Sequence, residues 1–163
     1  MLIDKKFSVA AMVALLGAAQ PAAAAETTAD LGVSASVLES CNLSAVTALA
    51  FGPVATNAAT PQITPGVVSI VCTNTKPSVT VSLDGGAQPD GTTRRMATSG
   101  GAFLPYKVHS DAGHANEISI GGTLYSGGVT AAVPTLLNVF GEIPQGNYSA
   151  GEYSDTIVVT LTY

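Results

Sequence analysis

The chain has no tryptophan, few charged residues and only two cysteines among its 163 residues. Charged side chains make up 10% of the sequence, against about 25% in an average soluble domain. The residues after Ala25 include ten acidic side chains but only four basic ones, Lys76, Arg94, Arg95 and Lys107. This shortage of cations argues against nucleic acid or an anionic membrane as a partner, because both bind through basic patches.

Motifs that carry catalytic chemistry are also missing. The sequence contains no nucleophile elbow, P-loop or Gly-x-Gly-x-x-Gly. His109 and His114 flank Asp111 in a Gly-containing turn, but zinc usually needs three or four converging ligands. We interpret this turn as a solvated loop, with a metal site as the alternative. We therefore assign no catalytic, cofactor-binding or metal-ligating residue, and we expect neither an enzyme nor a cofactor.

Two further polar features have structural interpretations. Asp84 and Asp90 bracket a Gly-rich turn, and ordinary turn chemistry accounts for both carboxylates. Arg94-Arg95 is the only basic pair after Ala25. We interpret this pair as part of a solvated hairpin edge; the alternative is a contact with a carboxylate of a partner.

The N-terminus has the pattern of a secretory leader. Lys5 and Lys6 precede a mostly apolar run over residues 7–19, and three alanines end at Ala25. Residues 1–25 are therefore predicted to be a signal peptide, with a buried N-terminal helix as the alternative. No later segment holds 18 consecutive apolar residues, the length that a spanning helix needs. Cleavage leaves 138 residues, enough for one exported domain.

Export places Cys41 and Cys72 in an oxidising compartment. Two cysteines in such a protein predict a disulfide. In the chain-entropy model, closing a loop of this size stabilises the fold by roughly 3–4 kcal/mol. A catalytic thiol is the alternative, but there is no Cys-x-x-Cys motif and neither histidine is close to a cysteine in sequence.

Residues 28–38 are the most informative segment of the chain. Apolar side chains occupy every second position, at Ala29, Leu31, Val33, Ala35 and Val37. A period of two predicts a strand with one buried face. No hairpin turn joins this segment to a neighbouring strand, so its backbone and its apolar row need a partner from its own domain or from another subunit.

The rest of the chain predicts short strands separated by turns, and no segment has a sustained helical period. We expect strands over residues 66–73, 78–83, 104–109, 118–125, 136–140 and 156–163. Turn signals occur at residues 84–86, 89–91, 99–101, 121–122, 127–128 and 144–146. Residues 53–66 contain three prolines and predict a loop at the edge of a sheet. Many short strands with regular turns indicate an all-β sandwich or barrel.

Alternation within these strands predicts their buried faces. We expect Val68, Ile70 and Cys72 to share one face, and likewise Val79, Val81 and Leu83. In the last predicted strand the shared face consists of Ile157, Val159, Leu161 and Tyr163.

In their order along the chain, several short motifs resemble the spore coat protein U domain family, which includes the subunits of archaic (Csu-type) chaperone–usher pili. The matching motifs are Cys41-Asn42-Leu43, Leu49-Ala50-Phe51-Gly52, Val71-Cys72-Thr73, Val81-Ser82-Leu83-Asp84-Gly85-Gly86, Arg94-Arg95-Met96, Leu104-Pro105-Tyr106-Lys107-Val108, Val139-Phe140-Gly141-Glu142-Ile143-Pro144 and Ala150-Gly151-Glu152-Tyr153-Ser154-Asp155-Thr156. A terminal strand ending in Tyr163 completes the resemblance, which covers nearly all of the chain after the leader.

The resemblance implies an immunoglobulin-like pilin sandwich that lacks its final strand. Its last strand would border an open apolar groove, filled first by a periplasmic chaperone and then, at the outer-membrane usher, by the N-terminal strand of the next subunit. On this basis we divide the chain into a signal peptide (1–25), a donor-strand segment (26–40) and a pilin domain (41–163). The alternating residues Ala29 to Val37 would be the donor strand.

The implied function is structural. A chain with one domain and a donor strand is expected to be a shaft or adaptor subunit, or the major pilin, of a surface pilus that supports adhesion and biofilm formation. Its partners would be the chaperone, the usher and other pilin subunits. Two alternatives stay open: a spore-coat or other extracellular coat protein, and a self-complemented secreted sandwich that binds a sugar or a metal.

Overall fold

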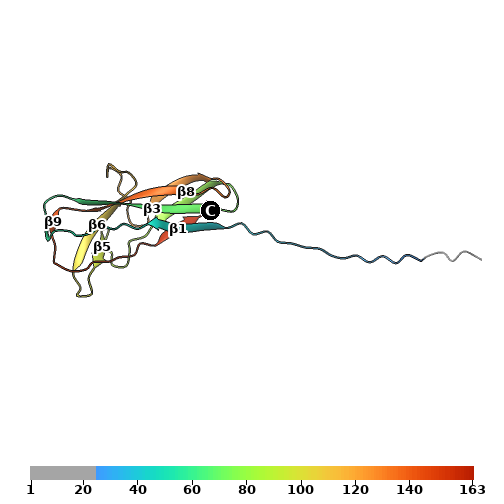
Figure 1. Ribbon diagram of the computed structural model, residues 1–163, viewed down its shortest axis with the longest axis horizontal. Coiled ribbons are helices and arrows are strands. Elements are labelled where there is room, and N and C mark those ends of the chain that lie inside the picture. Colours follow the sequence, from blue (N-terminus) through green and yellow to red (C-terminus); the bar gives the residue numbers. More distant parts are fainter. Residues whose placement is uncertain (1–24) are drawn as a thin grey trace, which may run out of the picture. The chain divides into compact units, whose positions relative to one another are not determined.

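The computed structural model describes residues 25–163, so most of the predicted signal peptide lies outside the described residues. The chain divides into two units, of which the first ends at Ser36 and the second is Val37–Tyr163. Within residues 25–163, all regular structure lies in the second unit and is β (Figure 1). Within residues 25–163, no helix is long and apolar enough to cross a membrane.

Two antiparallel sheets form the framework of the second unit. The larger sheet has the order β1-β3-β8-β6-β5 and contains β1 (Cys41–Thr47), β3 (Gln62–Cys72), β8 (Thr135–Ile143), β6 (Phe103–His109) and β5 (Arg94–Ala97). The smaller sheet has the order β10-β4-β7 and contains β10 (Val159–Thr162), β4 (Lys76–Leu83) and β7 (Thr123–Val129). The short strands β2 (Asn57–Ala58) and β9 (Gly146–Asn147) pair with each other. The structure is thus an immunoglobulin-like all-β sandwich, as the sequence predicts.

The core lies between the facing sides of the two sheets. Strand alternation sends one apolar row of each strand inward, and the predicted inward residues are buried: Val68, Ile70, Cys72, Val79, Val81 and Leu83. One apolar cluster lies around Ile70 and Val81, and a second lies around Val108 and Ile143. Val159 packs against both clusters, so the last strand contributes to both parts of the core.

Four predicted strands are confirmed with longer bounds. The strands predicted over 66–73, 78–83, 104–109 and 136–140 correspond to β3, β4, β6 and β8. The prediction that residues 53–66 form a loop is wrong at two places, because β2 occupies Asn57–Ala58 and β3 begins at Gln62. Pro65 fits there because this part of β3 pairs with β8 on one side, and β1 reaches only Val67 on the other.

The predicted strand over residues 118–125 is confirmed only at its end, where residues 123–125 belong to β7, and is wrong over residues 118–122. The chain turns at Gly121, which has a φ of 75°, and β7 starts only at Thr123. It then continues through Gly127 and Gly128, which the sequence predicts as a turn, because Gly127 and Val129 both pair with β4; Gly128 between them lies at an irregularity of the register. Added side-chain atoms at Gly128 would approach the carbonyls of Lys76 and Pro77 at 3.2 Å, so glycine fits this close approach of the backbones.

The predicted terminal strands are shorter or absent. Of residues 156–163, only Val159–Thr162 form β10, which pairs with Leu83 to Thr80 of β4. Residues 28–38 form no strand, and Leu31, Val33 and Val37 are each 89% exposed. A strand is defined by a hydrogen-bonding partner, and the single chain supplies none for this alternating segment.

Candidate functional site

An open groove lies between the two sheets, where β1 and β10 are edge strands. β1 borders the larger sheet and β10 borders the smaller one, and each pairs with a single neighbour. Ala45 and Thr47 occupy the inward face of β1, yet both are exposed to solvent. The alternation of β1 therefore points side chains inward at a place where no chain covers them.

One cavity of about 370 Å³ occupies the groove beside β10. Its walls come from the end of β1 and from the segment that leads into β10, and its floor comes from the core strands. Its apolar lining includes Leu49, Val68, Leu83, Val108, Ile157 and Val159. The cavity thus exposes the sandwich core along one edge.

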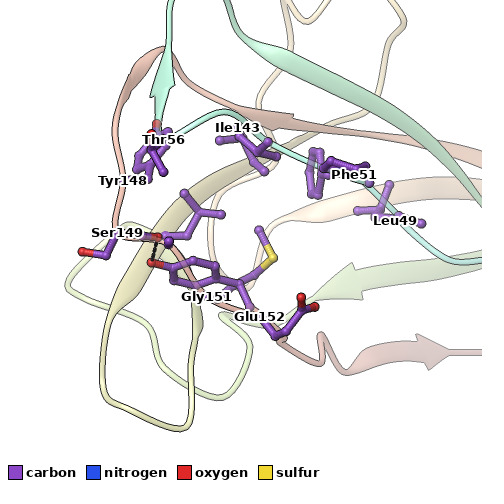
Figure 2. Close-up of a pocket in the computed structure, with 16 residues that line it drawn as sticks. Leu49, Phe51, Thr56, Ile143, Tyr148, Ser149, Gly151 and Glu152 are labelled. Atoms are coloured by element: carbon purple, nitrogen blue, oxygen red, sulfur yellow. Dashed lines mark hydrogen bonds between the residues drawn. The ribbon is translucent and has the colours of Figure 1, made fainter.

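A second cavity of about 660 Å³ continues the groove toward β9. The two cavities share Leu49, Phe51, Met96 and Tyr153 in their walls. Ile143, Tyr148 and Glu152 line the second cavity (Figure 2). Together the cavities form one continuous groove, which is bordered by residues 45–56 on one side and by residues 148–159 on the other.

The border formed by residues 153–158 is held in place by hydrogen bonds rather than by a long ladder. Ser154 pairs with Ala97 of β5, and the Asp84 carboxylate accepts a hydrogen bond from the Val158 amide at 2.8 Å. The Asp155 carboxylate accepts hydrogen bonds from the Tyr106 hydroxyl and from a backbone amide at residue 87. The segment therefore crosses from one sheet to the other before β10 begins.

Tyr106 and Gly86 are adapted to this crossing. Burial raises the pKa of the Tyr106 hydroxyl far above its ordinary value, and the hydrogen bond to Asp155 raises it further. Tyr106 therefore stays a protonated donor at every physiological pH. Gly86 has a φ of 77°, and a Cβ there would overlap the Asp155 carboxylate, so both the backbone and the close approach require glycine.

The predicted residues of the last strand line this groove in part. Ile157, Val159 and Leu161 are half-buried and pack against the two apolar clusters, whereas Val158 is 56% exposed. Ile157 and Val159 line the groove. Tyr163 is 54% exposed, and the Lys76 ammonium lies 5.5 Å from its ring centre.

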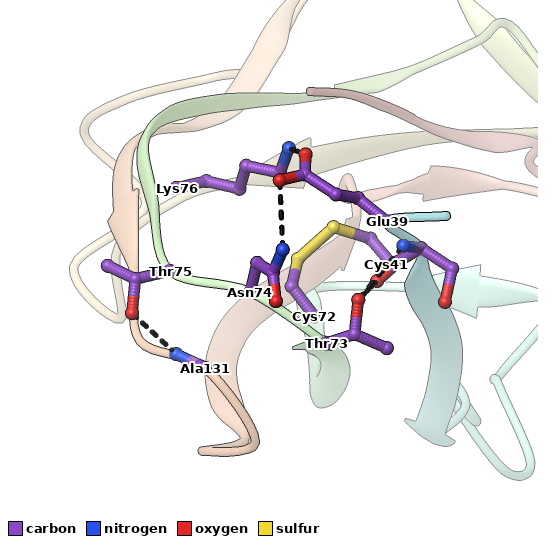
Figure 3. The surroundings of a disulfide bond; sticks show 9 residues. Glu39, Cys41, Cys72, Thr73, Asn74, Thr75, Lys76 and Ala131 are labelled. Atoms are coloured by element: carbon purple, nitrogen blue, oxygen red, sulfur yellow. Dashed lines mark hydrogen bonds and ion pairs between the residues drawn. A yellow bond between two sulfur atoms is a disulfide. The ribbon is translucent and has the colours of Figure 1, made fainter. Parts of the chain in front are cut away.

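Cys41 and Cys72 form the disulfide that the sequence predicts. They face each other across the β1–β3 ladder, so the bond attaches the exposed edge strand to the core strand (Figure 3). The disulfide thereby fixes one wall of the groove.

Other polar residues have positions that differ from the sequence interpretation. Arg94 is 3% exposed, and its guanidinium donates to the carbonyl oxygens of residues 83, 84, 118 and 119. The interpretation of Arg94 as solvated is therefore wrong, since it ties the turn after β4 to the turn before β7. Arg95 pairs with Asp90 at 2.9 Å.

The histidines lie away from the groove, on the outer side of the larger sheet. His109 is 3% exposed, its Nε2 lies 3.1 Å from a Glu142 oxygen, and its ring centre lies 5.0 Å from that of His114. Among residues 25–163, no three His, Cys, Asp or Glu side chains are placed to hold a metal ion.

Sequence reasoning missed the aromatic part of the groove. Phe51, Tyr148 and Tyr153 line it, but they lie outside regular strands, so strand periodicity did not select them. The one available signal was their position inside or beside the motifs that carry the family resemblance, as with Phe51 and Tyr153.

Comparison with known proteins supports the same fold. One similar solved structure is a chain of the CsuC–CsuE chaperone–tip adhesion subunit pre-assembly complex from the archaic chaperone–usher Csu pili of Acinetobacter baumannii. The TM-score is 0.56 and the sequence identity is 24%; the match covers 78% of this chain and 40% of that chain. No curated protein sequence matches the chain significantly. The family model of the Spore Coat Protein U domain matches residues 27–160, and the chain therefore belongs to this family.

Proposed function

We propose that the protein is a structural subunit of an archaic chaperone–usher pilus, a shaft or adaptor subunit that polymerises by donor-strand exchange. The observation that carries the proposal is the open groove between two unpaired edges, in a chain that also has an unpaired alternating segment. The groove has room for one more strand whose apolar face would cover the exposed core. Residues 29–37 have an alternating apolar face and no partner strand.

The dimensions of the two parts agree. A nine-residue donor segment spans about 30 Å when extended, which is close to the length of a long sheet strand such as β3. Leu31, Val33 and Val37 are each 89% exposed in the single chain. Burial of each of these side chains in the groove of a neighbouring copy contributes roughly 1.5–3 kcal/mol.

The pairing of the sheets supports one direction for the donor. Every strand pair of the domain is antiparallel, and we place the donor antiparallel to β10. Val37 then lies beside residues 148–153 of the acceptor, near the larger cavity. Ala29 lies near the end of β10 at the opposite end of the groove.

The partners and location follow from the same chemistry. An exposed core edge is an aggregation hazard, so the subunit needs a periplasmic chaperone until a donor strand arrives. We propose export by residues 1–25, transfer at an outer-membrane usher and a final place in a surface pilus. Adhesion and biofilm formation would then be properties of the fibre, and the subunit would carry out no catalysis.

Deletion of residues 27–37 tests the proposal. The truncated subunit should still form a soluble complex with a co-expressed pilus chaperone, but it should form no ladder of multimers on an unheated denaturing gel. It should also take up a synthetic peptide of residues 27–38 in place of the chaperone, with very slow release. Multimers of normal length from the truncated subunit would reject residues 27–37 as the donor strand.

A matched comparison separates a pilin from a self-complemented sandwich. Without any chaperone, the full-length subunit should aggregate or be degraded, because its groove is open. A soluble, monomeric full-length protein under those conditions would contradict polymerisation by strand exchange.

A further inference from the structure

The point where the N-terminal segment leaves the domain is clamped by several bonds at once (Figure 3). The Glu39 carboxylate pairs with the Lys76 ammonium and accepts a hydrogen bond from the Asn74 amide at 2.9 Å. The backbone of Ser40 exchanges hydrogen bonds with Thr73, and the disulfide of Cys41 follows. Three consecutive residues are therefore fixed to residues 72–76, which run from the end of β3 through a short connection to the start of β4.

Electrostatics add to this clamp. The hydrogen bond with Lys76, followed by that with Asn74, holds the pKa of Glu39 below its ordinary value. The carboxylate is therefore ionised at neutral pH and keeps its pair with Lys76. The Lys76 side chain also lies over the Tyr163 ring, so the clamp reaches the C-terminal residue as well.

Only one residue separates this clamp from the donor segment. Val37 is the last alternating apolar residue, Glu39 is the first clamped one, and Leu38 between them is 84% exposed. Two peptide steps span at most about 7 Å. When Val37 is seated in a neighbour's groove, the clamp must lie within that distance of the end of the groove.

We propose that the joint between successive subunits is short and stiff, with the clamped end of one copy seated directly against the groove end of the next. This inference rests on the proposed function. The two surfaces lie at opposite ends of the domain: residues 72–76 follow the end of β3, whereas Ile143 in the larger cavity pairs with Gln62 at its start. β3 has 11 residues, so about 30 Å separates the two ends.

This geometry gives a head-to-tail contact between different surfaces of identical copies. Such a contact does not close on itself in pairs and builds an open fibre. Each copy then has its orientation set by the clamp, because Leu38 alone provides too little chain for free rotation. Fibre stiffness would thus depend on residues 38–41 and 72–76, outside the groove itself.

An insertion tests the short joint. Gly-Ser-Gly-Ser placed between Leu38 and Glu39 should leave the multimer ladder on unheated gels unchanged, because the groove and the donor are intact. Electron micrographs should show the persistence length of the fibres falling by roughly threefold or more, because Gly-Ser chains are flexible coils. Four prolines at the same place should lengthen the repeat per subunit by about 12 Å with less loss of stiffness.

Clamp variants test the ion pair with the same readouts. Glu39→Ala and Lys76→Met should each give a normal ladder and more strongly bent fibres. The exchanged pair E39K with K76E should restore most of the stiffness. Glu117→Ala, which breaks the exposed ion pair with Lys107 away from the clamp, should match the unaltered protein.

The outcomes separate the two proposals. Normal ladders with unchanged stiffness after the Gly-Ser insertion would overturn the stiff joint and leave strand exchange standing. Failure of the unaltered protein to form any ladder in the presence of chaperone and usher would overturn the proposed function, and the inference with it. Normal ladders together with flexible fibres would support both.

Discussion

The two ends of the described part of the chain carry the same alternating sequence pattern and have different structures. Residues 28–38 and residues 156–163 both alternate apolar and polar side chains. The C-terminal segment pairs with β4 over Val159–Thr162 and packs against the core. The N-terminal segment has no strand, and its large apolar side chains are exposed.

The difference shows that alternation specifies a face but does not supply a partner. The C-terminal segment follows an anchored crossing at Ser154 and Asp155, which delivers it to the edge of β4. The N-terminal segment precedes the clamp at Glu39, and among residues 25–38 no hydrogen bond of this kind anchors it. Strand formation at each end thus depends on how the flanking residues are fixed, and the C-terminal segment also has the higher β-propensity, because it consists of Thr, Ile, Val, Leu and Tyr.

The largest expected effect comes from a charge on the apolar face of the N-terminal segment. Val33→Asp should abolish the multimer ladder on unheated gels, because an unpaired carboxylate in an apolar groove costs several kcal/mol. Ser34→Asp is the matched control on the other face, where a charge stays in solvent and should change stability by less than about 0.5 kcal/mol.

This pair of variants also tests the register. A slip of one residue would exchange the two faces, so loss of the ladder with Ser34→Asp alone would reverse the face assignment. Equal loss of the ladder with both variants would reject the face assignment. Normal ladders with both would make the N-terminal segment irrelevant to assembly, and the contrast between the two ends would lose its functional meaning.

Removal of the disulfide is expected to have the next largest effect. Replacing Cys41 and Cys72 together by serine removes the covalent bond between β1 and β3 and weakens the anchor of the N-terminal segment. The free energy of unfolding should fall by roughly 3–4 kcal/mol in the chain-entropy model. Urea unfolding of the subunit complemented with the 27–38 peptide would measure this change, and an unchanged midpoint would show that the ladder alone fixes β1.

The smallest effect concerns the anchor that distinguishes the C-terminal segment. Tyr106→Phe removes the hydrogen bond to the Asp155 carboxylate and should cost roughly 1.5–3 kcal/mol, as is typical of bonds to charged groups. Hydrogen exchange at the Val158 and Val159 amides should accelerate, because the C-terminal segment then loses part of the anchoring that the N-terminal segment lacks.

Tyr125→Phe is the matched control for this variant. The Tyr125 hydroxyl donates to the nearby Gly128 carbonyl at 2.7 Å in an exposed position. Loss of this hydrogen bond should lower the free energy of unfolding by less than about 0.5 kcal/mol. Equal exchange rates at residues 158 and 159 in both variants would show that β10 holds the segment without help from Asp155.

Much of the fold could be predicted because its signals are local. The period-two rows of β3 and β4 place the predicted residues in the core, and two cysteines after a predicted export signal predict the disulfide. Local signals failed where a neighbouring strand decided the conformation, as at Gly127 and Gly128 of β7. They also failed for Arg94, whose burial depends on carbonyl groups that two distant turns bring together.

The sequence by itself determined the all-β class, the inward faces of the main strands, the disulfide and the alternation of residues 28–38, on which the proposed donor strand rests. These properties follow from side-chain periodicity and composition, which are readable one segment at a time. Only the tertiary structure decided that β1 and β10 are unpaired edges with a continuous groove between them, and that the exit of the N-terminal segment is clamped. Both properties depend on which strands lie side by side, because a groove and a clamp are made by residues far apart in the chain.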